Sequence, residues 1–90
     1  MIRYLILVDG RVQGVGFRFF TQLTATNLKL TGWCKNLYDG RVKIEIQGSE
    51  ETLNKFISSL KKGNNFSRVD EMLINEIPVI DNEKNFSVKY

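Results

Sequence analysis

The sequence of 90 residues contains no histidine, a single cysteine and a single proline. Without histidine the chain cannot use Ser-His-Asp or Cys-His catalysis, and most zinc sites and histidine-based acid–base steps are excluded too. One cysteine can form neither a disulfide within the chain nor a thiolate metal cluster. We expect Cys34 to be a small buried apolar residue, because a reactive thiol would need another cation to lower its pKa.

Long apolar stretches are also missing. The apolar run over residues 2–8 is interrupted by Arg3 and is far shorter than the roughly 20 residues that span a bilayer. The same run lacks the longer apolar region and the small-residue cleavage site of a signal peptide. We therefore predict a cytoplasmic protein with no membrane partner.

The composition that is present, 42% hydrophobic and 26% charged, is typical of a globular domain. The length leaves no room for a second domain of ordinary size, so we predict a single domain over residues 1–90. The net charge of +3 is uneven, because all of the excess positive charge lies in residues 1–45 and the second half is slightly negative. This imbalance suggests an anionic partner near the first half, although a solvated surface of mixed charge would give the same count.

Two helices are predicted from apolar residues at helical spacing. The first spans about residues 17–30. The second begins after Ser49, a good N-cap, and ends before Gly63, which is typical of a helix C-terminus. The face of the first helix that we expect to pack against the sheet carries Phe20, Leu23 and Leu30.

Apolar residues at every second position predict strands over residues 2–9, 42–47 and 86–90. We also expect strands over residues 31–38, around Trp33, and 69–77, where the pattern leaves the buried face ambiguous. Asp39-Gly40 between two of these strands predicts a hairpin with a two-residue turn. The order is βαββαβ followed by a short C-terminal strand. It predicts an α+β fold of the ferredoxin-like, split βαβ type, an antiparallel sheet with two helices on one face.

A glycine-rich loop over residues 10–16 joins the first strand to the first helix. Glycines allow successive backbone N–H groups to turn inward and form an anion-binding nest, and the N-terminus of the following helix adds unpaired N–H groups. The spacing matches neither the dinucleotide-binding motif nor the phosphate-binding loop that ends in Gly-Lys-Ser/Thr. A plain glycine-rich turn would have the same composition, so the loop alone is weak evidence.

Arg18 and Asn36 are the candidate catalytic residues. Arg18 falls in the first turn of the predicted helix, where a positive charge opposes the helix dipole unless an anion is bound there. A guanidinium can hold two phosphate oxygens at once. The Asn36 side-chain amide could hold a water molecule for attack on phosphorus, although an asparagine close to a turn is also common for structural reasons.

Three segments together resemble the acylphosphatase family: residues 10–18 (GRVQGVGFR), 32–36 (GWCKN) and 85–90 (NFSVKY). The resemblance extends over nearly the whole chain and includes the ferredoxin-like fold. It implies hydrolysis of a carboxyl phosphate to a carboxylate and inorganic phosphate, without a metal, a cofactor or a phosphoenzyme. It also implies that Arg18 binds the phosphate oxygens and that Asn36 orients the attacking water. The backbone N–H groups implied to cradle the phosphate are those of Gln13, Gly14, Val15, Gly16, Phe17 and Arg18.

The implied substrate is a small anionic acyl phosphate, with inorganic phosphate as product and inhibitor. We expect a monomer that does not bind nucleic acid. The leaving carboxylate needs no general acid because its conjugate acid has a pKa of roughly 4, so the lack of histidine is compatible with this reaction. Four further basic residues add a positive field that could attract the substrate: Arg11, Lys35, Arg41 and Lys43.

Small departures from the family pattern leave the two candidate catalytic residues untouched. Leu37 stands where some members have threonine, Cys34 where valine is commoner, and Lys89 where arginine is frequent. Two other functions stay open from the sequence alone. One is a non-catalytic acyl-phosphate-binding or regulatory module. The other is a small RNA-binding ferredoxin-like domain, which is disfavoured because residues 42–47 contain no aromatic side chain.

Overall fold

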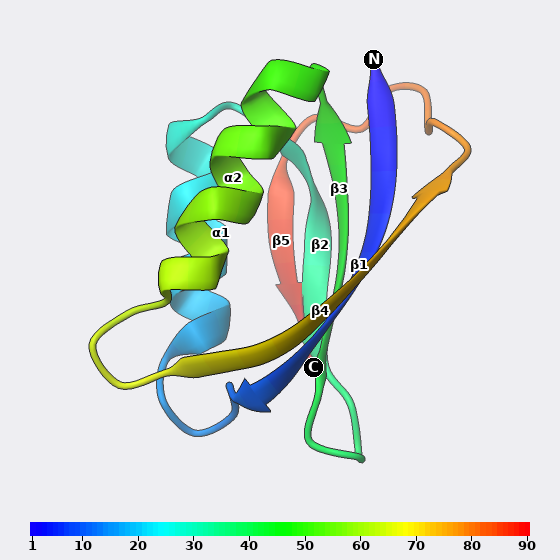
Figure 1. Cartoon of the computed structure of the whole chain (residues 1–90). Coiled ribbons are helices and arrows are strands. Elements are labelled where there is room, and N and C mark those ends of the chain that lie inside the picture. The colour runs from blue at the N-terminus through cyan, green and yellow to red at the C-terminus, as the bar shows by residue number, and fades with distance from the viewer.

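Five strands and two helices make up the computed structural model, which describes all residues from Met1 to Tyr90. The chain folds into an open sheet with both helices on one face (Figure 1). The sequence prediction of a ferredoxin-like α+β fold is confirmed, because the element order and the sheet match it. The elements are β1 (Ile2–Arg11), α1 (Phe17–Asn27), β2 (Thr31–Asn36), β3 (Val42–Gly48), α2 (Glu50–Lys62), β4 (Arg68–Ile77) and β5 (Phe86–Lys89).

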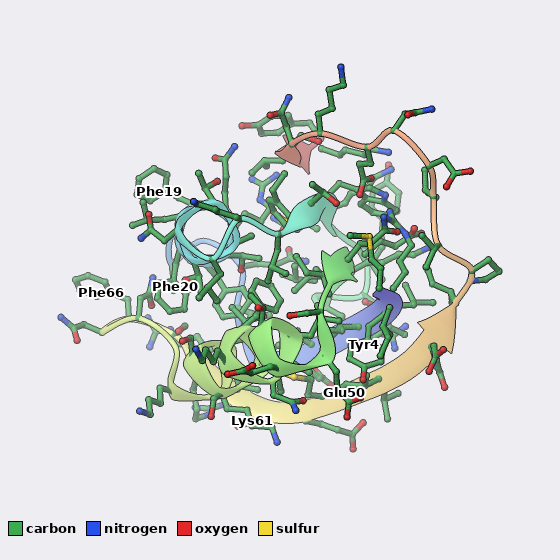
Figure 2. All side chains as sticks on the ribbon, turned by 90° about the horizontal axis from the view of Figure 1, so that it is seen from above. Tyr4, Phe19, Phe20, Glu50, Lys61 and Phe66 are labelled. Carbon is green, nitrogen blue, oxygen red and sulfur yellow. The ribbon has the colours of Figure 1, made fainter.

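The strands are arranged in the order β4-β1-β3-β2-β5. The pairs β4–β1, β1–β3 and β3–β2 are antiparallel as predicted, whereas β5 pairs parallel to β2 and makes the sheet mixed. The parallel pair arises because residues 78–85 carry the chain from β4 at one edge to the opposite edge (Figure 2). This segment crosses the face of the sheet that the helices leave open.

The core lies between the helices and the sheet. Alternate residues of β1 and β3 point into it, and α2 contributes three fully buried side chains, Leu53, Phe56 and Leu60, at the helical spacing from which the helix is predicted. Ser49 caps α2 by accepting a hydrogen bond from the Thr52 N–H (3.2 Å), and Gly63 closes it with a φ of 67°. The fully buried apolar residues include Ile6, Val8, Ile44, Ile46, Leu53, Phe56 and Leu60.

The predicted end of α1 is wrong, and of its predicted apolar face Phe20 packs against the core while Leu23 does not. The helix ends at Asn27, and Lys29 has a φ of 58°, so Leu30 enters the core from the connection to β2 rather than from the helix. Leu23 is 49% exposed. The face that packs against the sheet instead carries Phe17, Thr21 and Ala25.

Thr21 can occupy this buried face because its hydroxyl donates to the Phe17 carbonyl (2.8 Å), so this buried polar group is paired.

The β2–β3 connection also differs from the prediction. The Leu37 N–H donates to the Arg41 carbonyl (2.8 Å) and the Gly40 N–H donates to the Leu37 carbonyl (3.2 Å). Three residues, 38–40, therefore form the turn instead of two. Gly40 has a φ of 96°, which is the position where a three-residue hairpin turn favours glycine.

No helix of the structure is both long enough and apolar enough to cross a membrane.

Candidate active site

The connection from β1 to α1 forms a concave loop whose backbone donors are free. Gly14 (φ 72°) and Gly16 (φ 75°) adopt left-handed conformations, and Gly16 is the N-cap of α1. None of the backbone N–H groups of residues 13–19 donates to an acceptor within the chain. Free donors that converge on one concavity at a helix N-terminus can bind a phosphate-sized anion.

Arg18 places an uncompensated positive charge beside these donors. It belongs to the first turn of α1, which contains no acidic residue, and it takes part in no ion pair. Its Nη1 donates to the Lys89 carbonyl (3.3 Å), and its guanidinium carbon lies 4.8 Å from the centre of the Tyr90 ring. The guanidinium is thus positioned by neutral groups at the end of β5, which leaves its charge free to act on a bound anion.

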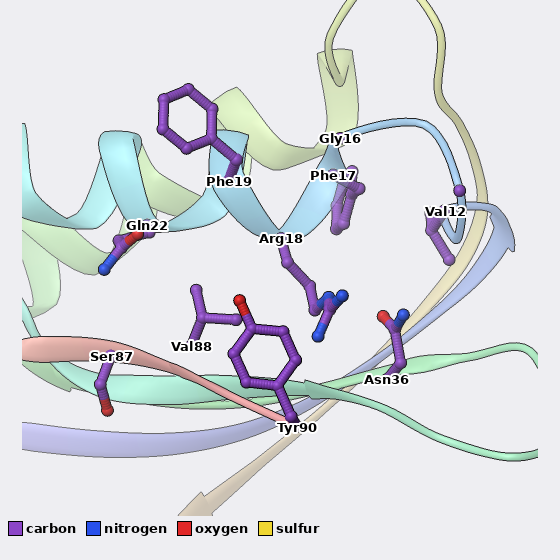
Figure 3. Close-up of a pocket in the computed structure, with 11 residues that line it drawn as sticks. Val12, Gly16, Phe17, Arg18, Phe19, Gln22, Asn36, Ser87, Val88 and Tyr90 are labelled. Carbon is purple, nitrogen blue, oxygen red and sulfur yellow. The ribbon is translucent and has the colours of Figure 1, made fainter.

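Asn36 contributes an unpaired acceptor. As the last residue of β2 it lies on the same face of the strand as Cys34, toward the helices, and its side chain points into the space below the loop (Figure 3). Its Oδ1 is buried and has no hydrogen-bond partner. Burying an unpaired acceptor costs about 1–3 kcal/mol, so such an atom is expected to have a partner in the working site.

One pocket of about 530 Å³ brings these groups together. It contains the loop, Arg18 and Asn36, and it extends along the groove between α1 and β5. The two predicted catalytic residues therefore lie in one place although they belong to different elements (Figure 3). A neighbouring pocket of about 450 Å³ shares Asn36 and Tyr90 with it. The residues lining the first pocket are Val12, Gly14, Gly16, Phe17, Arg18, Phe19, Gln22, Asn36, Ser87, Val88 and Tyr90.

Two side chains anchor the loop from opposite sides. The Gln13 Nε2 donates to the Leu37 carbonyl (2.8 Å) and the Arg41 carbonyl (2.9 Å), which fastens the loop to the β2–β3 hairpin. On the other side, the Asn64 Nδ2 donates to the Val15 carbonyl (2.9 Å) from the segment between α2 and β4. The loop is therefore held in shape without using its own backbone N–H groups.

The Cys34 thiol is unsuited to nucleophilic chemistry. The residue is fully buried in the core, as predicted, and burial raises the pKa of its thiol to about 12 despite the opposing effect of the nearby Arg18 charge. A thiol with this pKa is protonated at neutral pH and therefore a weak nucleophile.

The other basic residues expected near the site have different surroundings. Arg41 forms an ion pair with Asp39 (2.8 Å), and the Lys43 ammonium lies 5.7 Å from the centre of the Trp33 ring. Lys35 lines only the neighbouring pocket. Arg11 lines neither pocket. Their field can reach the site, but none of them lines the pocket that contains Arg18.

Sequence reasoning missed three contributors: Tyr90, the Gln13 side chain and Asn64. Tyr90 falls within the quoted segment 85–90, so its proximity to the site was the easiest of the three to anticipate. Asn64 carried only the signal of a turn after Gly63. No group of three or more His, Cys, Asp or Glu side chains in the structure could hold a metal ion.

Comparisons with known proteins agree with this geometry. A family model described as Acylphosphatase matches residues 4–88. An acylphosphatase of Clostridium beijerinckii is 59% identical to the chain over 90 residues, with 100% of both sequences covered. The crystal structure of acylphosphatase from Bacillus subtilis superposes with a TM-score of 0.95 at 46% identity, again with 100% of both chains covered.

The same fold also occurs within a larger protein. The structure of HypF from T. kodakarensis matches 100% of this chain with a TM-score of 0.88 and 37% identity, but the match covers only 12% of HypF.

Proposed function

Since the chain belongs to the acylphosphatase family and hydrolyses acyl phosphates, we propose that the reaction takes place in the pocket formed by the β1–α1 loop, Arg18 and Asn36. The observation that carries this proposal is that one pocket is lined by loop residues with free backbone N–H groups, by Arg18, which forms no ion pair, and by Asn36, whose Oδ1 has no partner. We therefore prefer hydrolysis to the two alternatives that the sequence alone left open, a non-catalytic acyl-phosphate-binding or regulatory module and an RNA-binding domain.

The backbone N–H groups of residues 13–18 and the Arg18 guanidinium hold the phosphoryl oxygens. These donors are fixed before the substrate binds, so little reorganisation is needed as negative charge spreads over the oxygens in the transition state. Arg18 also brings two donors in a planar fork, which matches a pair of phosphate oxygens.

Asn36 orients the attacking water. Its Oδ1 accepts a hydrogen bond from the water, which directs a lone pair of the water oxygen toward phosphorus. The new bond joins the water oxygen to phosphorus, and the bond between phosphorus and the acyl oxygen breaks with its electron pair retained by the carboxylate. The two protons of the water stay with the inorganic phosphate that is released. Because that carboxylate is a stable leaving group with a conjugate-acid pKa of roughly 4, no side chain has to protonate it.

We further propose that the reaction requires no metal ion, because fixed N–H donors and Arg18 supply the positive charge that a metal would otherwise provide. The experiment is hydrolysis of benzoyl phosphate by the purified protein in the presence of EDTA, with p-nitrophenyl phosphate as the control substrate. We expect rapid loss of the acyl phosphate only. Hydrolysis that stops on chelation would refute metal independence, and equal hydrolysis of the phosphomonoester would refute the leaving-group argument.

Residues 1–90 share one core and one sheet, which supports a single domain. We propose that this domain works as a monomer, because every group of the site comes from one chain. Sedimentation at increasing protein concentration would test the monomer. Its cytoplasmic location, its lack of nucleic-acid binding and its inhibition by inorganic phosphate stay predictions.

A further inference from the structure

The segment that follows α2 is attached to the outside of the phosphate loop. Asn64 lies just after Gly63, the C-cap of α2, and its Nδ2 donates to the Val15 carbonyl (2.9 Å), 49 positions away in the chain. No other protein donor is hydrogen-bonded to this carbonyl. The contact therefore links the loop to an element that contributes nothing to the pocket lining.

The orientation of the Asn64 amide is determined by its own surroundings. Its Oδ1 accepts hydrogen bonds from the Phe66 N–H (3.1 Å) and the Ser67 N–H (2.8 Å). Because both of those partners are donors, the oxygen must face them, and the NH₂ group must face Val15. Asn64 thus has two separable tasks: its oxygen shapes the turn, and its nitrogen holds the Val15 carbonyl.

The Val15 carbonyl and the Gly16 N–H belong to the same peptide unit. In a planar trans peptide these two groups point in opposite directions. The structure contains no cis peptide bond, so a carbonyl held outward by Asn64 requires the Gly16 N–H to point the other way. Gly16 lines the pocket and its N–H has no acceptor within the chain, so an N–H turned away from Asn64 is available to a ligand bound there.

Glycine itself does not hold this orientation. A flip of the Val15–Gly16 peptide would reverse the N–H and change the φ of Gly16 from its value of 75°. Glycine accepts positive and negative φ about equally well, so the flip meets little steric resistance at Gly16. An external contact on the carbonyl is therefore needed to keep the donor directed inward.

We propose that Asn64 is a positioning residue that locks the Val15–Gly16 peptide with its N–H directed at the bound phosphoryl group. The proposal rests on the function given above, in which this loop holds the phosphate. The lock acts on binding: the hydrogen bond from Gly16 is present with substrate and transition state alike, so its loss raises KM far more than it lowers kcat.

The decisive variant is Asn64→Ser. A serine hydroxyl can still accept a hydrogen bond in the turn but is too short to reach the Val15 carbonyl. The control is Ser67→Ala. Ser67 Oγ accepts a hydrogen bond from the Asn64 backbone N–H (3.0 Å), so this substitution weakens the same turn. It leaves the hydrogen bond from Asn64 to the Val15 carbonyl in place. Three quantities are compared: the phosphate dissociation constant, KM and kcat for benzoyl phosphate, and the shift of the Gly16 amide in ¹H–¹⁵N spectra on addition of phosphate.

For Asn64→Ser we expect the phosphate dissociation constant and KM to rise about 10-fold, because one hydrogen bond to a charged group is lost. We expect kcat to change less than about 3-fold. The Gly16 amide should respond to phosphate in the wild type and in Ser67→Ala, and lose that response in Asn64→Ser.

Wild-type affinity with a retained Gly16 response in Asn64→Ser would overturn the lock. Equal loss of affinity in Ser67→Ala would also overturn it, because the turn as a whole and not the bond to Val15 would then be responsible. If phosphate shifts none of the amides of residues 13–18 in the wild type, the proposed phosphate site fails and the lock fails with it.

Discussion

At the scale of single residues, Arg18 stands out because it carries a positive charge, paired with no carboxylate, at a helix N-terminus that lines a pocket. It lies in the first turn of α1, where the dipole already presents positive potential, and its contacts are a carbonyl and an aromatic ring. Repulsion of this kind disfavours the helix start slightly in the empty protein and becomes attraction when a dianion binds. We therefore expect Arg18 to serve both binding and turnover.

Replacing Arg18 by alanine is expected to lower kcat/KM for benzoyl phosphate about 10²–10³-fold, the loss seen when one donor to a developing oxyanion is removed. The inhibition constant of inorganic phosphate should rise about 10- to 100-fold, because the same group binds the ground state. Steady-state kinetics with phosphate as inhibitor measure both. Arg11→Ala is the matched control, since it removes the same charge from an exposed residue outside the pocket. Unchanged phosphate inhibition in Arg18→Ala would contradict the assigned role.

Asn36→Ala is expected to separate turnover from binding. Loss of the group that orients the water should lower kcat about 100-fold, while phosphate inhibition stays within about 2-fold of the wild type. Because Oδ1 has no partner to lose and its unpaired burial carries a cost, the free energy of unfolding should not fall in this variant. Asn65→Ala, an exposed asparagine outside the pocket, serves as control. A variant that turns over like the wild type would remove Asn36 from the mechanism.

The residues that could be predicted from the sequence are those whose chemistry is local. Arg18 was identified because a cation in a first helical turn conflicts with the helix dipole, and the family motif singled out Asn36 as well. Asn64 could not be identified, because its role depends on a contact across 49 positions that only the folded chain creates. Gln13 was assigned to the loop through its backbone, whereas its side chain bonds the hairpin.

At the scale of elements, sequence patterns predicted α2 well and α1 poorly. In α2 the cap, the apolar repeat and the closing glycine agree, so every local preference favours the same helix. In α1 the buried face includes Thr21 and Ala25. A polar residue and a small one contribute little to the pattern of large apolar residues from which a buried helix face is predicted. Thr21 is tolerated there because its hydroxyl bonds within the helix, a detail of geometry that composition does not reveal.

Strand β2 depends on Gly32 for its close approach to β3. Gly32 has a φ of 143°, and a Cβ at this position would overlap the carbonyl of Glu45 on the neighbouring strand. The glycine is therefore required by the pairing that places Asn36 at the end of β2, and not by contact with the pocket, which it does not line.

Gly32→Ala is expected to lower the free energy of unfolding by about 3 kcal/mol or more, since overlap with backbone adds to the strain of a left-handed φ. Gly40→Ala is the matched control, because Gly40 also has a positive φ (96°) but open space at its Cβ position, so only the strain of about 1–2 kcal/mol applies. Urea unfolding of both variants measures the difference. Equal decreases in the free energy of unfolding would show that overlap with the β3 backbone does not add to the destabilisation by Gly32→Ala.

At the scale of the whole molecule, a buried arginine joins segments from both ends of the chain. Arg3 of β1 is fully buried on the sheet face opposite the helices, where its guanidinium bonds Glu45 (3.0 Å) and Glu83 (2.8 Å). On the same face the Gln47 side chain donates to the Ile80 carbonyl (2.9 Å) and accepts from the Ile80 N–H (2.9 Å). Together these bonds hold residues 78–85 against the sheet and so place β5, which supports Arg18, at its edge.

This arrangement makes stability depend on pH through Glu83. Burial raises the pKa of its carboxyl, but hydrogen bonds from Arg3 and Thr31 and the Arg3 charge more than offset that effect, so the pKa lies below the ordinary value of 4.5. A carboxyl whose pKa is lower in the folded than in the unfolded state stabilises the fold fully above the unfolded pKa. That contribution disappears as the pH falls through the folded pKa.

Glu83→Gln keeps the size of the side chain and removes its charge, so it isolates this contribution. At pH 7 we expect the free energy of unfolding to fall by about 1–3 kcal/mol, less than for a fully broken buried pair because Arg3 retains Glu45. The difference in the free energy of unfolding between wild type and variant should shrink as the pH drops below about 4. At that pH the Glu83 carboxyl of the wild type becomes protonated and therefore neutral, like the glutamine of the variant. Urea unfolding from pH 7 to pH 3 measures this difference. The control is Glu76→Gln, because Glu76 is exposed and forms no ion pair. A difference that stays constant over this range would show that the Arg3–Glu83 pair does not produce the acid sensitivity.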